Sequence, residues 1–165
     1  MFRSVRLPAG IPGTLRLHSM PGREEPLKEV WEEIQSEGVQ IIVCLAGLEE
    51  IRTKSPAYAA ALEARTTPCL VESFPVADYG VPDDREAFWS LASKTARQLR
   101  TGNRVLIHCG AGIGRTGTLA TCVLLALGVP RAKAEQAVSA AGSHPETPGQ
   151  RKLVSWCVDR AQAGK

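Results

Sequence analysis

Residues 105–118 read VLIHCGAGIGRTGT, and this stretch joins a short apolar strand to a glycine-rich loop that leads into an apolar helix. Glycines at positions 110, 112 and 114 allow the backbone to turn tightly, with several N–H groups directed inward. Such N–H groups at the positive end of a helix bind anions. In parallel α/β sheets, ligands bind at this place, beyond the carboxyl ends of the strands. The stretch therefore predicts a cradle for a phosphate-like dianion.

Apolar patterning on both sides of this loop predicts alternating strands and helices. Residues 14–18 alternate apolar and polar side chains, as in an edge strand, and residues 39–45 are almost entirely apolar, as in a strand buried on both faces. We expect further strands at 69–74 and 105–107, loops at 49–54 and 75–84, and helices at 27–37, 56–65, 118–127, 132–141 and 149–161. Another helix is expected directly after the 75–84 loop, because Phe88, Leu91, Thr95 and Leu99 recur at helical spacing. This order predicts a three-layer α/β sandwich with a mostly parallel sheet of four to five strands.

The composition predicts one soluble domain that spans residues 1–165. A chain that is 44% hydrophobic and 22% charged has enough apolar material for a core, which excludes a disordered protein. The longest apolar run, 118–129, is far shorter than the ~20 residues of a membrane-spanning helix. Residues 1–6 lack the apolar stretch of a secretory signal. We therefore expect a cytoplasmic protein without a membrane span, and a monomer.

Charge and cysteine content indicate no nucleic-acid partner, metal or cofactor. The net charge is only +3, and the 20 basic and 17 acidic residues are interleaved without a basic arm. The five cysteines lack the paired spacing of a disulfide framework or a zinc site. Four of them lie in apolar stretches and are interpreted as small core residues: Cys44, Cys69, Cys122 and Cys157.

The fifth cysteine, Cys109, opens the glycine-rich loop, and Arg115 closes it. Inward N–H groups, a helix N-terminus and a guanidinium all favour a thiolate over a thiol, so we expect Cys109 to be a nucleophile that attacks bound phosphorus. Arg115 offers a planar fork that binds two phosphoryl oxygens at once. The hydroxyl of Thr116 can donate a hydrogen bond to the thiolate when it leaves the phosphorylated intermediate.

Two other phosphate-binding motifs explain the loop less well. Gly112, Gly114 and Gly117 satisfy the dinucleotide pattern G-x-G-x-x-G, which would indicate a nicotinamide-dependent reductase. Glu135 only weakly meets the acidic partner expected ~20 residues later, and no second βαβ half follows. A nucleotide P-loop is excluded because the chain contains no Gly-Lys-Ser/Thr.

The histidines are harder to interpret from the sequence. We expect His108 to orient the loop through backbone hydrogen bonds, with direct acid–base catalysis as the alternative. His18 and His144 have no partner that the sequence identifies.

The glycine-rich loop resembles the signature of the cysteine-dependent protein tyrosine phosphatase superfamily. The signature consists of His108 and Cys109, five further residues, and then Arg115 and Thr116. Its position two-thirds along the chain is similar to that in the dual-specificity branch. The resemblance implies a phosphotyrosine protein phosphatase-like fold and a phospho-cysteine intermediate. It also implies that the loop binds the substrate phosphate, through Gly110, Ala111, Gly112, Ile113, Gly114 and Arg115.

Upstream, residues 74–83 (FPVADYGVPD) resemble the general-acid loop of the subgroup that includes cyclin-dependent-kinase-associated phosphatase and Cdc14-like enzymes. The resemblance implies that Asp78, 31 positions before Cys109, protonates the leaving oxygen and later activates water. A tyrosyl or seryl oxygen leaves poorly until it is protonated. Asp83 and Asp84 are the alternatives for this role, although both are interpreted as helix caps.

Two further segments resemble the family less completely. Residues 146–150 (ETPGQ) are similar to its glutamine loop, with Gln150 at the second glutamine position and Glu146 at the first. Gln150 is thus either a supporting residue for water positioning or a first-turn helix residue. Glu49 and Glu50 fall either in an acidic loop beside the pocket or in a solvated surface loop.

The resemblance thus implies a protein phosphatase that hydrolyses phosphotyrosine, and also phosphoserine or phosphothreonine, in a phosphoprotein or phosphopeptide. A non-catalytic phosphopeptide-binding module on the same fold is one alternative. A phosphatase for a non-protein ester such as a phosphoinositide is another. The variable loop positions Gly110, Ala111 and Ile113 carry no lysine to bind extra phosphates, which disfavours a highly phosphorylated inositol.

Overall fold

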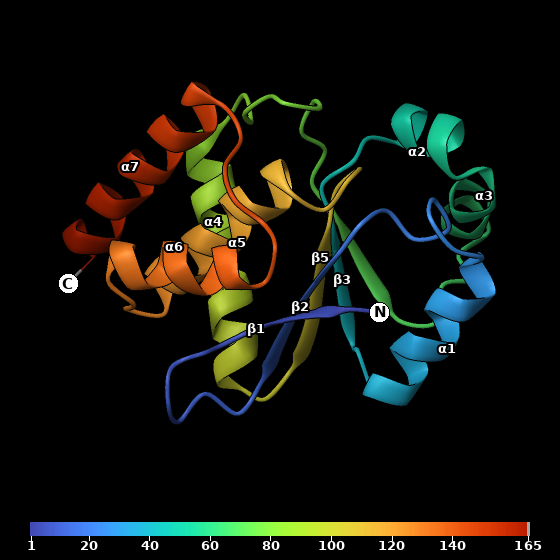
Figure 1. The fold of residues 1–165 in the computed structure, drawn as a ribbon, viewed down its shortest axis with the longest axis horizontal. Helices are drawn as coiled ribbons and strands as arrows, with labels where there is room; N and C mark the ends of the chain where they lie inside the picture. Colours follow the sequence, from blue (N-terminus) through green and yellow to red (C-terminus); the bar gives the residue numbers. More distant parts are fainter. Residues whose placement is uncertain (165) are drawn as a thin grey trace.

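A five-stranded sheet in the order β1-β2-β5-β3-β4 forms the centre of the computed structural model, which describes residues 1–164 (Figure 1). The first strand, β1 (Arg3–Val5), is antiparallel to β2 (Thr14–His18). The remaining strands run parallel to β2: β5 (Arg104–His108), β3 (Ile41–Cys44) and β4 (Leu70–Ser73). The predicted mostly parallel sheet is confirmed.

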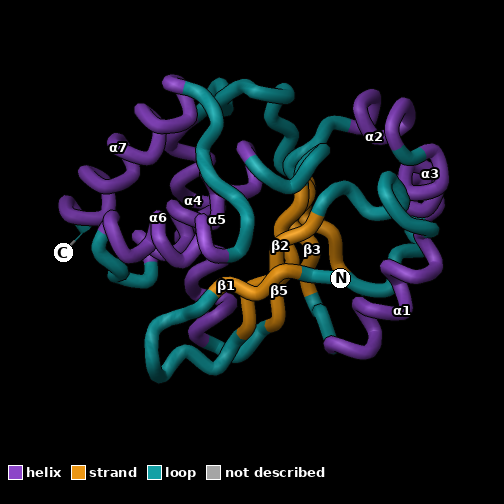
Figure 2. Tube along the Cα trace, in the orientation of Figure 1, coloured by secondary structure: helices purple, strands orange, loops and turns teal. Residues whose placement is uncertain are grey.

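Helices cover both faces of the sheet, so the predicted three-layer architecture is also confirmed (Figure 2). One face is covered by α1 (Leu27–Glu37), α2 (Leu48–Lys54) and α3 (Pro56–Ala64). The other is covered by α4 (Arg85–Arg100), α5 (Gly114–Ala126), α6 (Arg131–Ala140) and α7 (Pro148–Ala163). Within residues 1–164, no helix is both long and apolar enough to cross a membrane.

The alternation of side chains along the strands explains why each face is buried. On β3, Ile41 and Val43 pack in the core beneath α4, α5 and α7, whereas Ile42 and Cys44 pack on the side of α1 and α3. All four side chains of β3 are buried, which agrees with a central parallel strand.

One expectation about the sheet is wrong. Strand β2 is not an edge strand, because β1 pairs with it in the register Arg3↔Leu17. The sequence of β1 is Arg-Ser-Val, and three residues are too short to show a strand period. The edge strands of the sheet are therefore β1 and β4.

Two helices also begin where the sequence predicts loops. Residues Leu48–Lys54 form α2, whose seven residues carry five charged or polar side chains and little apolar periodicity. Helix α5 begins at Gly114, four residues before the predicted start. The glycines that obscure this start in the sequence place Arg115 and Thr116 in the first turn of α5, close to the end of β5.

The carboxyl ends of the parallel strands define the edge at which the candidate site lies. The loop 109–113 leaves β5 there and leads into α5. Figure 1 shows segment 75–84 and the start of α7 at the same edge. Segments that are far apart in the sequence thereby lie at the same edge of the sheet as the glycine-rich loop.

Candidate active site

Cys109 lies at the floor of the loop that joins β5 to α5. Its side chain is 2% exposed, and the Gly112 N–H donates to its Sγ at 3.3 Å. The first turn of α5 begins at Gly114, so the positive end of the helix dipole is close to the sulfur. These are the surroundings from which the sequence predicts a nucleophilic Cys109, and that role remains a prediction.

The carbonyl groups at the start of the loop are held on its outer side. The Cys109 carbonyl contacts His108 Nδ1 at 3.0 Å, and the Gly110 carbonyl accepts from Met20 N at 2.9 Å. In a trans peptide the C=O and the following N–H point in opposite directions, and residues 1–164 contain no cis peptide. The N–H groups of Gly110 and Ala111 are therefore directed into the loop.

The same arrangement continues at Gly112, whose carbonyl has two outer donors. Arg3 Nη2 and Ser143 Oγ each lie 2.6 Å from this oxygen. The following N–H, that of Ile113, is thereby directed into the loop. Gly112 itself has a φ of 76°, and a Cβ on it would lie 2.3 Å from the His18 carbonyl oxygen, so only glycine fits.

The last carbonyl of the loop, that of Ile113, accepts from His144 N at 3.2 Å and from Gly117 N at 2.8 Å. This contact directs the N–H of Gly114 inward as well. Four N–H groups thus converge on the space above Cys109, as a cradle for a phosphate-like dianion requires.

His108 is buried, and both of its ring nitrogens are engaged. If Nδ1 donates to the Cys109 carbonyl, Nε2 is left to accept from the Tyr58 hydroxyl at 2.8 Å. Burial lowers the pKa of His108 to about 4, so the ring is neutral at pH 7. These contacts agree with the orienting role expected for His108, which remains a prediction.

Arg115 lies in the first turn of α5 with its guanidinium almost completely buried. Its Nη1 donates to Glu50 Oε1 at 2.7 Å and to the Val76 carbonyl at 2.8 Å. Its Nη2 donates to Glu50 Oε2 at 2.9 Å and to Asp78 Oδ1 at 3.1 Å. The guanidinium is therefore fixed beside the loop by two carboxylates and a backbone carbonyl.

Glu50 and Lys54 extend this cluster along α2. Hydrogen bonds from Arg115, followed by those from Lys54, lower the pKa of Glu50 to about 2 although burial opposes the shift. Lys54 Nζ lies 2.8 Å from Glu50 Oε2 and 3.6 Å from Asp78 Oδ2. Glu49, by contrast, pairs with Arg52 on the surface. Of the two glutamates left open by the sequence, Glu50 belongs to the site.

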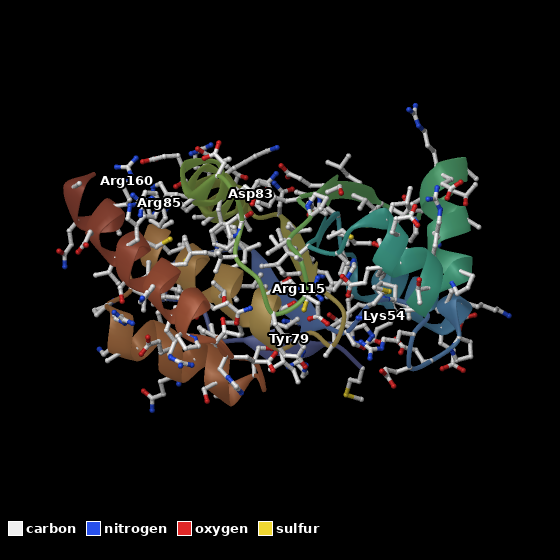
Figure 3. The ribbon with its side chains drawn as sticks, turned by 90° about the horizontal axis from the view of Figure 1, so that it is seen from above. Lys54, Tyr79, Asp83, Arg85, Arg115 and Arg160 are labelled. Carbon is white, nitrogen blue, oxygen red and sulfur yellow. The ribbon has the colours of Figure 1, made fainter. Side chains whose placement is uncertain are left out.

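Of the three aspartates between Pro75 and α4, Asp78 is the one that contacts Arg115. Asp84 caps α4 by accepting from Ala87 N at 3.0 Å, as expected. Figure 3 shows Asp83 toward α4 and Tyr79 near Arg115. This placement favours Asp78 over its alternatives, and its catalytic role remains a prediction.

A family model described as "Swiss Army Knife protein, DSP-PTPase phosphatase domain" matches residues 9–159. The chain belongs to this family. The kinase-associated phosphatase, with its catalytic-site cysteine replaced by serine, has the same fold, with a TM-score of 0.82, 21% identity and coverage of 99% of this chain and 96% of that one. PTPMT1 in complex with PI(5)P also shares the fold, with a TM-score of 0.72, 17% identity and coverage of 91% and 93%.

A human relative matches this DSP-PTPase domain over a short stretch only. Receptor-type tyrosine-protein phosphatase H from Homo sapiens is 42% identical over 45 residues, which are 26% of this chain. The match spans 4% of the length of that protein.

Thr116 of the DSP-PTPase domain is buried in the first turn of α5. Its Oγ1 has no hydrogen-bond partner among the described residues. A buried hydroxyl without a partner is costly, so a group that it serves is expected in the reacting complex. The predicted hydrogen bond from Thr116 to the leaving thiolate would satisfy it.

Gln150 is a first-turn helix residue, and its role in water positioning remains a prediction. It lies in the first turn of α7, where its backbone N–H donates to the capping Thr147 hydroxyl at 3.2 Å. Its buried side chain accepts from Glu146 N at 2.7 Å and donates to the Gly80 carbonyl at 3.2 Å. Gln150 thus joins the start of α7 to the loop that carries Asp78.

Sequence reasoning missed several residues of the DSP-PTPase site. Arg3, Ser143, Tyr58 and Lys54 all contact residues that it identified. Arg3 lies 109 residues from the Gly112 carbonyl that it contacts, and no local motif marks such a pair. Lys54 follows Glu50 by four residues, so a helical reading of 48–54 would have placed both on one face. Within residues 1–164, no group of three or more His, Cys, Asp or Glu side chains is placed to bind a metal.

Proposed function

We propose that this domain hydrolyses phosphate monoesters of protein side chains, phosphotyrosine above all, through a phospho-cysteine intermediate on Cys109. The observation that carries the proposal is the position of Cys109 Sγ at the floor of four inward N–H groups, with the Arg115 guanidinium beside them. A dianion bound there places its phosphorus in front of the sulfur, and the charge that develops during transfer is stabilised by the same donors.

In the first half-reaction, Cys109 Sγ attacks the phosphorus, and an S–P bond forms as the ester P–O bond breaks. The protonated carboxyl of Asp78 gives its proton to the leaving phenolic oxygen. This role is supported by the position of the Asp78 Oδ1, which lies 3.1 Å from Arg115 Nη2, a donor that would bind the transferring group. The products are a free tyrosyl hydroxyl and S-phosphocysteine.

In the second half-reaction, the Asp78 carboxylate takes a proton from a water molecule, whose oxygen attacks the phosphocysteine. The S–P bond breaks, and the Thr116 hydroxyl donates a hydrogen bond to the departing thiolate. Gln150 supports this step by joining the start of α7 to the Asp78 loop through Gly80. Inorganic phosphate and the thiolate enzyme are regenerated.

The rim of the site bears on the class of substrate that the domain binds. A cleft of about 470 Å³ is lined by Gly47, Glu50 and Lys54 and by the segment from Pro75 to Asp78, and so includes both carboxylates that contact Arg115. Two apolar side chains next to Asp78 are exposed, Tyr79 at 63% and Val81 at 43%, and offer contacts to a peptide. In this cluster the cations Lys54 and Arg115 are already paired with the carboxylates of Glu50 and Asp78, so the cluster has no excess positive charge for the additional phosphates of a highly phosphorylated ligand.

The proposal is tested with a substrate panel of phosphotyrosine peptide, phosphothreonine peptide and PI(5)P, each assayed with the unaltered domain and with Cys109→Ser. We expect phosphate release from the phosphotyrosine peptide that Cys109→Ser abolishes. Preferred hydrolysis of PI(5)P would reassign the substrate to lipids. Tight peptide binding without release of phosphate would instead make the domain a phosphopeptide-binding module.

A further inference from the structure

Arg3 connects the N-terminal strand to the phosphate-binding loop. Its Nη2 donates to the Gly112 carbonyl at 2.6 Å, and its Nη1 donates to Ser143 Oγ at 2.9 Å and to the Ala141 carbonyl at 2.7 Å. Ser143 Oγ in turn donates to the same Gly112 oxygen. Arg3 and Ser143 therefore both donate to the Gly112 carbonyl, and a third hydrogen bond joins them to each other.

The sheet fixes the direction of the Arg3 side chain. Arg3 lies opposite Leu17 in the β1–β2 ladder, and alternation along β1 sends its side chain to the same face as Val5. Val5 is buried in the core with α5 and α6, while Phe2 packs edge-on against His18 on the other face. Buried neighbours on both sides thus hold Arg3 in place before any ligand binds.

The contact has a chemical consequence for the loop. When the Gly112 carbonyl is held outside, the N–H of Ile113 in the same peptide plane is directed at the space above Cys109. Among the described donors that hold the loop carbonyls, Arg3 alone carries a formal charge, since His108 is neutral. Hydrogen bonds from charged donors are about twice as strong as those from neutral ones.

The charge also acts on Cys109. Partial burial lowers the pKa of Arg3, and the nearby Cys109 thiolate opposes this shift by favouring the charged guanidinium. The same Coulombic attraction acts in return on the Cys109 sulfur when it carries a negative charge. Arg115 is neutralised by Glu50 and Asp78 when no substrate is bound, whereas Arg3 forms no ion pair with residues 1–164.

We propose that Arg3 is a positioning residue of the phosphate-binding loop, which aims the Ile113 N–H at a bound oxyanion and stabilises the Cys109 thiolate from outside the pocket. The proposal rests on the proposed function, because it takes the loop to be an oxyanion site. The competing interpretation is that Arg3 only joins β1 to the end of α6 through Ala141 and Ser143.

Two readouts that require no turnover separate these interpretations. The first is the dissociation constant of tungstate, a non-covalent oxyanion, measured by titration calorimetry. The second is the pH profile of alkylation of Cys109 by neutral iodoacetamide, followed by mass spectrometry of the Cys109 peptide. The variants are Arg3→Gln, Arg3→Lys and Ser143→Ala. The matched control is Arg6→Gln, since exposed Arg6 also lies near the N-terminus and forms no hydrogen bond or ion pair with residues 1–164.

We expect Arg3→Gln to weaken tungstate binding by about tenfold, as the loss of one charge-assisted contact implies. Its alkylation profile should move to higher pH by roughly half a unit or more. Ser143→Ala should weaken tungstate binding by a smaller factor and leave the alkylation profile in place. Arg3→Lys should keep the alkylation profile of the unaltered domain and bind tungstate about threefold more weakly, because lysine lacks the planar fork.

Arg6→Gln should behave as the unaltered domain in both readouts. The proposal is overturned if Arg3→Gln and Arg3→Lys match Arg6→Gln in tungstate affinity and alkylation profile, even when their melting temperatures fall. That result would leave Arg3 as a structural link. A domain that binds tungstate with the predicted dependence on Arg3 but hydrolyses no ester refutes the proposed function alone, whereas one that binds no tungstate refutes both.

Discussion

Arg115 and Glu50 form a two-point ion pair in the site, with Nη1–Oε1 at 2.7 Å and Nη2–Oε2 at 2.9 Å. The carboxylate holds the plane of the guanidinium in a fixed orientation before substrate arrives. Because the side chain of Arg115 is 2% exposed and that of Glu50 is 18% exposed, water screens the pair only partly. The ion pair therefore links the stability of the fold to the geometry of the phosphate clamp.

Replacement of Glu50 by glutamine should destabilise the domain at neutral pH and not in strong acid. The pKa of Glu50 is about 2 in the folded protein against an ordinary 4.5, so its stabilising effect is complete above pH 4.5 and lost as the pH falls through 2. We expect Glu50→Gln to lower the free energy of unfolding at pH 7 by roughly 1–3 kcal/mol, with a difference that shrinks below pH 4.5. Urea unfolding at pH 7, 5 and 3 measures it.

Glu49→Gln is the matched control, because Glu49 is 87% exposed and belongs to the same helix. It should leave the free energy of unfolding almost unchanged at every pH. Equal effects of the two substitutions would contradict a special role for the Glu50–Arg115 pair.

His108 should make the fold sensitive to mild acid. Its pKa is about 4 in the folded protein against 6.5 ordinarily, so between pH 6.5 and 4 the unfolded chain binds a proton that the folded chain does not. Stability is therefore lost as the pH falls through this window, by roughly 2 kcal/mol between pH 6.5 and 5. In His108→Asn, whose amide can still donate to the Cys109 carbonyl, this dependence should become clearly smaller, with a remainder from His18, whose pKa is also lowered by burial.

The measurement is again urea unfolding, now at pH 7 and 5, with His144→Asn as control. His144 is exposed, and its contact with the loop uses the backbone N–H, which the substitution retains. An acid dependence in His108→Asn that equals that of the unaltered domain would show that His108 is not the neutral, buried group described.

Asp78→Asn should slow the chemical step in a way that depends on the leaving group. We expect kcat for a phosphotyrosine peptide to fall by about 100-fold to 10,000-fold with little change in KM, because the asparagine cannot donate the required proton. The loss should be smaller in the cleavage step for p-nitrophenyl phosphate, whose leaving group needs no proton. Single-turnover kinetics with both substrates measure the difference.

Asp83→Asn provides the comparison for Asp78, since Asp83 is exposed on the same loop. It should leave both rates close to those of the unaltered domain. A normal rate in Asp78→Asn combined with a slow Asp83→Asn would reassign the general acid to Asp83.

Tyr79 should contribute to the recognition of peptides and not to chemistry. It has a φ of 60°, a left-handed conformation that asparagine tolerates, so Tyr79→Asn removes the ring without disturbing the backbone. KM for a phosphotyrosine peptide should rise roughly three- to tenfold, as the loss of one aromatic contact implies. Steady-state assays should find kcat/KM for p-nitrophenyl phosphate unchanged, and an equal loss on both substrates would refute the recognition role.

The sequence contains enough information to predict the central part of the fold and much of the candidate site. Apolar runs identify β3 and β5, and the change from strand to glycines marks the loop at Cys109. The capping preference of aspartate predicts that α4 starts at Asp83 or Asp84, and the structure shows that Asp84 is the cap. Each of these features depends on residues that are neighbours in the chain.

What the sequence does not reveal depends on pairs that only the fold brings together. Strand β1 is too short to be recognised in the sequence. The contact of Arg3 with Gly112 therefore cannot be predicted until the β1–β2 register is known. The choice between Glu49 and Glu50 requires the helical phase of α2, and the hydrogen bond between Tyr58 and His108 joins residues 50 positions apart.

The central claim is that phosphate passes through Cys109, and trapping the intermediate tests it most directly. Asp78→Asn should form the intermediate from p-nitrophenyl phosphate and hydrolyse it slowly, because the base of the second step is missing. After rapid denaturation, mass spectrometry should find one phosphoryl group on the peptide that carries Cys109 and none when Cys109→Ser is added. Release of p-nitrophenol at an undiminished rate from Cys109→Ser, or a phosphoryl group on any other residue, would contradict the mechanism.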